Sequence, residues 1–231
     1  MGLVRNQPFF NGRYFLYDIL WETNFSITIM EILEKIFGST AKVKMMRMFL
    51  FNPTAIYDVD DMVGRTQLRG SEVRKELSNM EKMGMLRKKS FYKDVVVRGK
   101  DTKKRSIGWY LNSGFPFSKE LQALLVTTVP IKNGEIVRKL NRAGKIKLII
   151  VAGIFIQDSD SRVDLLVVGD EIKKGTLENT IRHIESEVGK ELRYTSFETD
   201  DFKYRLGVYD KLIRDILDYP HHVIVDKMGL K

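Results

Sequence analysis

The sequence predicts a mixed α/β protein of the α+β kind, with two parts that follow one another along its 231 residues. Residues 30–112 show helical periodicity and then two alternating segments, whereas residues 113–231 alternate between helical and strand patterns. Residues 39–112 hold 17 basic and 8 acidic residues and therefore account for the whole net charge of +9. A charge excess confined to one part is typical of a surface that binds a polyanion.

The composition excludes several classes of protein. Hydrophobic residues make up 43% and charged residues 30% of the chain, as in an ordinary folded protein. Cysteine is absent, which excludes disulfides and cysteine-bound zinc and fits a reducing cytoplasm. No apolar run approaches the length of a membrane span. We therefore expect a cytoplasmic protein without a membrane partner.

Helical patterns begin after an N-terminal extension, residues 1–29, whose order the sequence leaves uncertain. Apolar residues at three- and four-residue steps predict helices over 30–37, 40–51, about 58–65 and about 70–83. The expected buried faces are Ile32, Leu33, Ile36 and Phe37; Val43, Met46, Phe49 and Leu50; and Val73, Leu77 and Met80. Arg69 stands where a Ser or Thr cap is common, so we expect the last helix to begin without a side-chain acceptor.

Two alternating segments, residues 86–97 and 104–112, follow the helices and predict a β-hairpin with a polar turn at 98–103. This order of elements, and the stretch "VRKELSNMEKMGMLRKK" at 73–89, resemble the winged helix–turn–helix of prokaryotic regulators. In that fold the third helix enters the major groove and the hairpin follows the DNA backbone. The resemblance implies double-stranded DNA as the partner and the following contact residues: Ser71, Arg74, Lys75, Ser78, Arg87, Lys88, Lys89, Lys93, Lys103, Lys104 and Arg105.

An alternating α/β pattern follows the Gly- and Pro-containing stretch "LNSGFPFSKEL" at 111–121. It predicts helices over 118–126, 132–143, 174–189 and 199–219, and strands over 145–155, 162–170, 191–198 and 222–226. The helix at 174–189 is expected to bury Leu177, Ile181, Ile184 and Val188, and the helix at 199–219 to bury Phe202, Leu206, Tyr209, Leu212, Ile213 and Ile216. We therefore divide the chain into an extension (1–29), a winged part (30–112) and an α/β part (113–231).

The segments "LIIVAG" and "SRVDLLVVGD" resemble the active-site strands of a minimal nucleotidyltransferase. Two carboxylates two residues apart on such a strand project from one face and can hold Mg²⁺ against a triphosphate. Together with the linker at 111–121, they resemble a prokaryotic group that fuses a winged helix to such a domain, over residues 32–226. The resemblance implies a small α/β domain with a mixed sheet.

The departures from this pattern decide the expected chemistry. Ile154 follows Gly153 where the family has Ser or Gly, and Arg162 replaces the first acid, so that only Asp164 remains. A guanidinium about 4 Å from a cation costs roughly 4 kcal/mol per unit charge at an effective dielectric of 20. We therefore expect Arg162 to pair with Asp164, and we assign no catalytic residue, metal or cofactor. Asp158 and Asp160 precede the strand in a segment that we interpret as a solvated acidic turn.

These observations leave hypotheses from different classes. The first is a DNA-binding transcriptional regulator whose degenerate nucleotidyltransferase-like domain dimerises, binds a protein partner or senses a ligand. A homodimer is expected because two-fold proteins bind two half-sites. The alternative is an active Mg²⁺-dependent nucleotidyltransferase that modifies a toxin or an RNA, with Asp164 helped by Asp160. A third is an RNA-binding or protein-docking module that uses the same basic hairpin.

Overall fold

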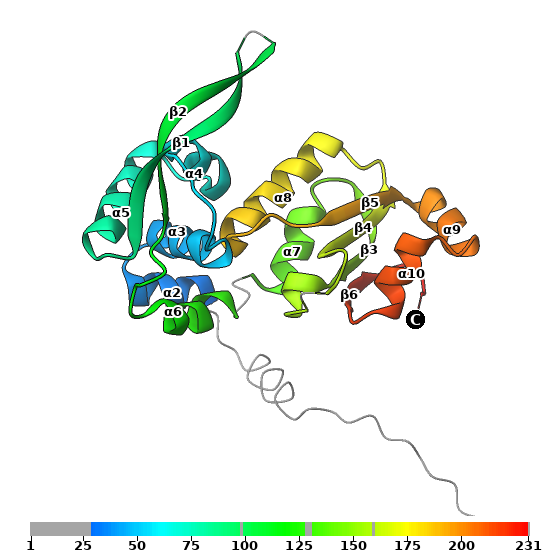
Figure 1. Cartoon of the computed structure of the whole chain (residues 1–231). Helices are drawn as coiled ribbons and strands as arrows, with labels where there is room; N and C mark the ends of the chain where they lie inside the picture. The colour runs from blue at the N-terminus through cyan, green and yellow to red at the C-terminus, as the bar shows by residue number, and fades with distance from the viewer. Residues whose placement is uncertain (1–28, 98, 128–130, 159, 231) are drawn as a thin grey trace, which may run out of the picture.

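The computed structural model in Figure 1 describes residues 29–97, 99–127, 131–158 and 160–230. The expected extension therefore lies, apart from Ile29, outside the described residues. The described chain is a mixed α/β structure, with a helical group that bears a long hairpin beside a four-stranded mixed sheet. Over these residues, no helix is long and apolar enough to cross a membrane.

The helical group contains α2 (Ile29–Phe37), α3 (Thr40–Phe51), α4 (Val59–Thr66) and α5 (Gly70–Lys82). Capping residues set two of the helix starts: the Ser39 hydroxyl accepts from the Lys42 N–H, and Asp58 and Asp61 form a reciprocal capping box. As expected, α5 begins without a side-chain acceptor at Arg69. The four predicted helices are therefore present, with ends close to those that the sequence indicates.

The core of this group lies around α3. The residues predicted to be buried on α3 and α5 are buried, namely Val43, Met46, Phe49, Leu50, Val73, Leu77 and Met80. The predicted face of α2 is partly wrong, because Ile32 is 41% and Ile36 is 62% exposed. Helix α6 (Ser118–Val126) adds Leu125 to this core, although the expected boundary at residue 112 grouped it with the α/β part.

The hairpin is longer than the sequence indicated. Strand β1 (Leu86–Val97) pairs antiparallel with β2 (Lys100–Leu111) along its whole length, so only two residues separate the strands instead of the expected six. Figure 1 shows its far half projecting away from the helices. At its base, Tyr57 and Trp109 exchange backbone hydrogen bonds of 3.0 and 2.8 Å, which adds a single-residue third strand.

The sheet has the order β5-β4-β3-β6. Strand β3 (Lys145–Val151) is antiparallel to both β4 (Leu165–Asp170) and β6 (His222–Asp226), and β4 is parallel to β5 (Tyr194–Glu198). Helices α7 (Asn133–Leu140) and α8 (Lys174–Val188) cover one face, and α9 (Thr199–Gly207) and α10 (Lys211–Asp218) cover the other. The continuous apolar runs of β3 and β4 follow from this burial on both faces.

Several predicted boundaries in this part are wrong. Strands β4 and β5 each begin three residues later than expected, and β3 ends at Val151, before a short 3₁₀ turn, Gly153–Phe155. The helix expected over 199–219 is two helices. Tyr209 has a φ of 56° and is 77% exposed, and the Asp210 carboxylate accepts from the N–H groups of Leu212 and Ile213, which starts α10 anew.

Candidate nucleic-acid interface and buried carboxylate site

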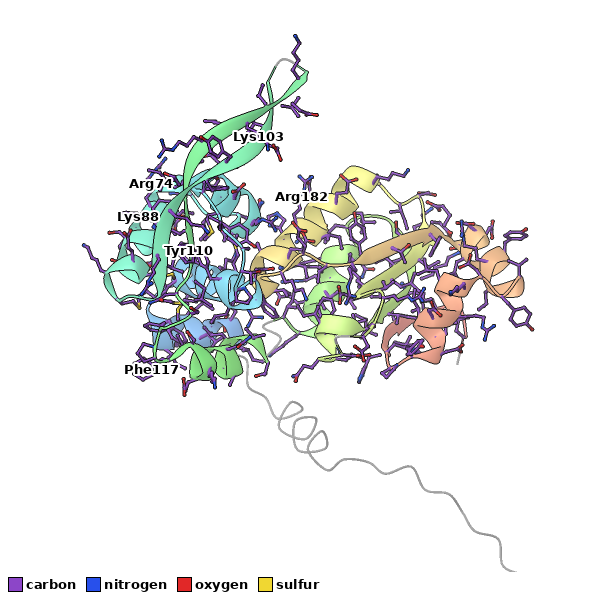
Figure 2. The ribbon with its side chains drawn as sticks, in the orientation of Figure 1. Arg74, Lys88, Lys103, Tyr110, Phe117 and Arg182 are labelled. Atoms are coloured by element: carbon purple, nitrogen blue, oxygen red, sulfur yellow. The ribbon has the colours of Figure 1, made fainter. Side chains whose placement is uncertain are left out.

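The outer face of α5 is polar and exposed. Val73, Leu77 and Met80 anchor the opposite face in the core, which leaves Ser71, Arg74, Lys75 and Ser78 in solvent. Within the described chain, Arg74 and Lys75 form no ion pair. Figure 2 shows Arg74 on the side of the molecule away from the four-stranded sheet. The helix therefore presents two cations and two hydroxyls to any partner on that side.

The hairpin is strongly basic, with nine basic and two acidic residues over 86–111. Lys103 and Lys104 are exposed and make no ion pair with a described residue. Arg105 donates to the Ser90 hydroxyl at 3.3 Å, and the Lys89 ammonium lies 5.1 Å from the centre of the Tyr110 ring. Arg87 is also exposed. Most of the hairpin cations predicted to bind phosphates are thus exposed and make no ion pair with a described carboxylate.

The base of the hairpin is fastened to the end of α5 through Glu81. Lys88 and Trp109 face each other across the two strands, and Lys88 pairs with Glu81 at 2.9 Å while the Trp109 ring N–H donates to it at 3.2 Å. The hydrogen bond from Lys88 lowers the pKa of the Glu81 carboxyl, with a further contribution from Trp109. Lys88 remains 57% exposed, so it can still approach a phosphate.

Lys93 has a different role from the other residues predicted to bind DNA. Its ammonium binds Asp61 at 2.7 Å and Asp58 at 3.0 Å, and its side chain is only 28% exposed. Ser106 also donates to Asp58, at 3.1 Å. Because two carboxylates at the start of α4 neutralise Lys93, this residue joins the hairpin to α4 and is poorly placed to bind a phosphate.

The second predicted site centres on Asp164, which is 2% exposed. Its Oδ1 accepts from the Ile154 N–H at 3.0 Å and from Nη2 of Arg193 at 3.0 Å. Its Oδ2 accepts from the backbone N–H of Arg193 at 2.8 Å and from its Nε at 3.1 Å. Both carboxylate oxygens are therefore occupied by N–H donors.

The expectation that Arg162 neutralises Asp164 is wrong. Arg162 pairs instead with Asp215 of α10 at 2.8 Å, and Arg193, from the segment before β5, binds Asp164. The hydrogen bond to Asp164 raises the pKa of Arg193 above its ordinary value, so this guanidinium stays charged. The available signal was the position of Arg193 at the start of the strand expected over 191–198.

Gly153 leaves room for the Asp164 carboxylate. It has a φ of 52°, and a Cβ at this position would lie 2.1 Å from Oδ1 of Asp164. The residues present do not fit Mg²⁺, because the Arg193 guanidinium lies against the carboxylate and leaves it no open oxygen. In the described ranges, no three acidic or histidine side chains cluster to hold a metal. The Asp160 N–H donates to Asp158 at 2.9 Å, as in a short acidic turn.

Sequence reasoning missed Arg47, which is 1% exposed between the two groups of elements. Its Nε donates to the Val188 carbonyl of α8 at 3.0 Å, its Nη1 donates to the Leu125 carbonyl of α6, and its guanidinium lies over the Phe51 ring. The available signal was a single arginine inside the otherwise apolar run "MMRMFLF". Gly189 allows this approach, since a Cβ there would lie 2.8 Å from the Arg47 Cβ.

Comparisons of this chain with models of protein families, with curated proteins and with solved structures give no significant match.

Proposed function

We propose that this chain is a DNA-binding transcriptional regulator that contacts double-stranded DNA through a winged helix–turn–helix. The C-terminal α/β part would then be a catalytically degenerate nucleotidyltransferase-like domain that serves dimerisation, partner binding or ligand sensing. The proposal rests on the resemblance described above and on the chemistry of the exposed surface.

The basic hairpin is the observation that supports the proposal best. Its two strands are each twelve residues long and project from the helices in Figure 1. Of the hairpin, only the base is buried. Exposed strands gain little from packing, and like charges on them repel one another. Lys103 faces Asp94 across the two strands, whereas Lys104 faces another cation, Lys93. Arg87 and Lys104 make no ion pair with a described residue, and a phosphate backbone would stabilise both.

The order of the elements is in keeping with this proposal. Helices α3, α4 and α5 precede the two long strands, and the Tyr57–Trp109 bridge lies where a winged helix has a short first strand. In such a fold α5 is the helix that enters the major groove, and its exposed Arg74 and Lys75 could then bind base edges or phosphates. A homodimer stays part of the proposal, since one such helix covers a single half-site.

The alternative, an active nucleotidyltransferase, gains no support from the carboxylate site. Asp164 is bound by Arg193 on both oxygens, and Asp160 is exposed in the preceding turn. Transfer of label from a nucleoside triphosphate with Mg²⁺, abolished in Asp164→Ala, would overturn the degenerate assignment and leave the DNA-binding proposal to its own test.

A mobility-shift titration against salt tests DNA binding. We expect the logarithm of the affinity for duplex DNA to fall linearly with the logarithm of the salt concentration. Arg74→Ala with Lys75→Ala, and separately Lys103→Ala with Lys104→Ala, should weaken binding and reduce this slope by about 1 for each phosphate that is no longer neutralised. A duplex RNA and a single-stranded DNA of the same sequence serve as competing ligands.

Lys203→Ala with Lys211→Ala is the matched control, because both lysines are exposed on α9 and α10 and the same two charges are removed. It should change neither affinity nor slope. Absence of binding at low salt, or equal losses in the control and in the α5 and hairpin variants, would contradict the proposal. Tighter binding to RNA than to DNA would favour the RNA-binding module instead. Light scattering of the purified chain reports whether it is a dimer.

A further inference from the structure

A small pocket lies where the helical group meets the α/β part. Its volume is about 190 Å³, and it is formed by α3, α4, α8 and the residues after α8. Figure 2 shows Arg182 on α8, at the edge that faces α4 and the hairpin. The charged residues that line it are Lys44, Arg65, Arg182, Glu185, Lys190 and Glu191.

Lys44 is a cation held by uncharged groups. Its ammonium donates to the Thr66 carbonyl at 3.3 Å and to the Ser186 hydroxyl at 3.2 Å. Burial lowers the pKa of Lys44 more than the nearby carboxylates of Glu187 and Glu72 raise it. An anion that entered the pocket would favour the charged form of Lys44.

The two carboxylates of the pocket are already engaged. Glu191 pairs with Arg65 at 2.6 Å, and Glu185 accepts from the Leu192 N–H at 2.7 Å. Burial also raises the pKa of Glu185, so its charged form is disfavoured. By contrast, Arg182 and Lys190 are exposed and form no ion pair within the described chain. Among the described residues, three cations therefore border the pocket without a carboxylate partner at ion-pair distance.

We propose that this pocket binds the phosphate group of a small metabolite, with Lys44 at its base and Arg182 and Lys190 at its mouth. Phosphate is the class of ligand that three cations bordering one pocket recognise best. The pocket is smaller than the roughly 300–1,000 Å³ of sites that enclose a whole drug-sized ligand. It holds the phosphate, and the rest of the molecule extends through the mouth.

Because the pocket lies between the two parts, a ligand bound there would regulate DNA binding. This inference rests on the proposed function. Lys44 belongs to α3 and Arg182 to α8, so a bound phosphate connects the proposed DNA-binding part with the α/β part. A ligand that binds one relative arrangement of two parts better than another shifts the population toward it. Coupling between two such sites changes affinity by about 5- to 150-fold.

Calorimetry with the full chain tests ligand binding without DNA. The probes are inorganic phosphate, pyrophosphate and adenosine monophosphate, with adenosine as the uncharged comparison. We expect at least one phosphate-bearing probe to bind and adenosine not to bind. Arg182→Gln and Lys44→Met should each weaken binding about tenfold or more, whereas Lys203→Gln should not. Arg182 is exposed, so its variant keeps the proposal testable if Lys44→Met fails to fold.

Two outcomes overturn the site: no phosphate-bearing probe binds at millimolar concentration, or binding is unchanged in Arg182→Gln. The regulatory step has a separate readout, the affinity for duplex DNA with and without the probe that binds. Phosphate binding without any DNA binding would contradict the proposed function but still support the phosphate-binding pocket. DNA binding that no bound probe changes would contradict only the coupling.

Discussion

Arg193 binds both carboxylate oxygens of Asp164, through Nε at 3.1 Å and Nη2 at 3.0 Å, and adds its backbone N–H at 2.8 Å. One residue before β5 thus supplies three of the donors that surround the acid at the start of β4. The arginine places a positive charge beside the buried acid, and the acid in turn fixes the segment before β5.

Replacing Arg193 should destabilise the fold more than replacing Arg162. Asp164 has a side chain that is only 3% exposed, so Arg193→Leu leaves a buried carboxylate with fewer donors. We expect the free energy of unfolding to fall by about 2–3 kcal/mol, as for a buried charged group that loses its partner. Arg162→Leu removes a pair whose arginine is 59% and whose carboxylate is 18% exposed, so it should cost less, about 1–1.5 kcal/mol. Urea denaturation measures both, and equal losses would contradict this assignment.

A methyl group at Gly153 should disrupt the same site from the other side. The Cβ would lie 2.1 Å from Oδ1 of Asp164, at a φ of 52° that disfavours other residues. We expect Gly153→Ala to lower the unfolding free energy by more than about 2 kcal/mol or to prevent folding. Gly175→Ala is the control, because a Cβ in that helix meets nothing within 4 Å and should stabilise it by roughly 0.5–1 kcal/mol. A stable Gly153→Ala variant would show that the Asp164 carboxylate can move away from residue 153.

Much of the fold could be predicted from the sequence because its signals are local. Helix periodicity identified the buried faces of α3, α5 and α8, and uninterrupted apolar runs identified β3 and β4. The break at Tyr209 could not be recognised, since both halves of 199–219 keep the same period and only the cap at Asp210 separates them. The Tyr57–Trp109 bridge was missed because a strand of one residue produces no alternating pattern in the sequence.

The candidate sites depend on tertiary partners, and there the sequence was less reliable. Arg162 is close to Asp164 in the chain, but Asp215 of α10 and Arg193 before β5 decide which residues meet. In the sequence, Lys93 cannot be distinguished from the other basic residues of the hairpin. Only the structure shows that Asp58 and Asp61 at the start of α4 lie against it. Charge patterns indicate where a polyanion could bind, but not which cations the protein has already neutralised.

Lys93→Met should therefore affect stability rather than DNA binding. The substitution leaves Asp58 and Asp61 facing each other without a cation, and we expect it to cost about 1–2 kcal/mol of unfolding free energy. The salt dependence of DNA binding should remain that of the unmodified protein. Lys103→Met is the matched control and should show the opposite pattern, with unchanged stability and a shallower slope. A weaker salt dependence of DNA binding in Lys93→Met would show that Lys93 does contact a phosphate.

The same cluster predicts a loss of stability in acid. Burial raises the pKa of Asp58, but hydrogen bonds from the Asp61 N–H, Lys93 and Ser106 outweigh it and hold this pKa below the ordinary value. A lowered pKa adds stability above the unfolded pKa of about 4, and this stability is lost as pH falls through the folded pKa. Asp58→Asn keeps a capping oxygen but not the charge. The unfolding free energies of the two proteins should therefore differ at pH 6 and converge toward pH 3.

Arg47→Met tests the junction between the two groups of elements. Methionine fills a similar volume, but it leaves the carbonyls of Val188 and Leu125 without the guanidinium that they bind. Each buried acceptor that loses its donor costs about 1–3 kcal/mol, so we expect a loss of roughly 2–4 kcal/mol. Arg214→Met removes an exposed arginine that pairs with Asp218 at 3.6 Å and should stay within about 1 kcal/mol of the unmodified protein.

Hydrogen exchange separates a local effect of Arg47→Met from a global one. Because Arg47 holds the end of α8 against α3, the amides near Val188 should exchange faster than those of β3 and β4, which lie in the centre of the sheet. Uniform acceleration across the chain would indicate that the two groups unfold as one unit. Unchanged exchange near Val188 would show that Gly189 and the surrounding apolar contacts hold the junction without the arginine.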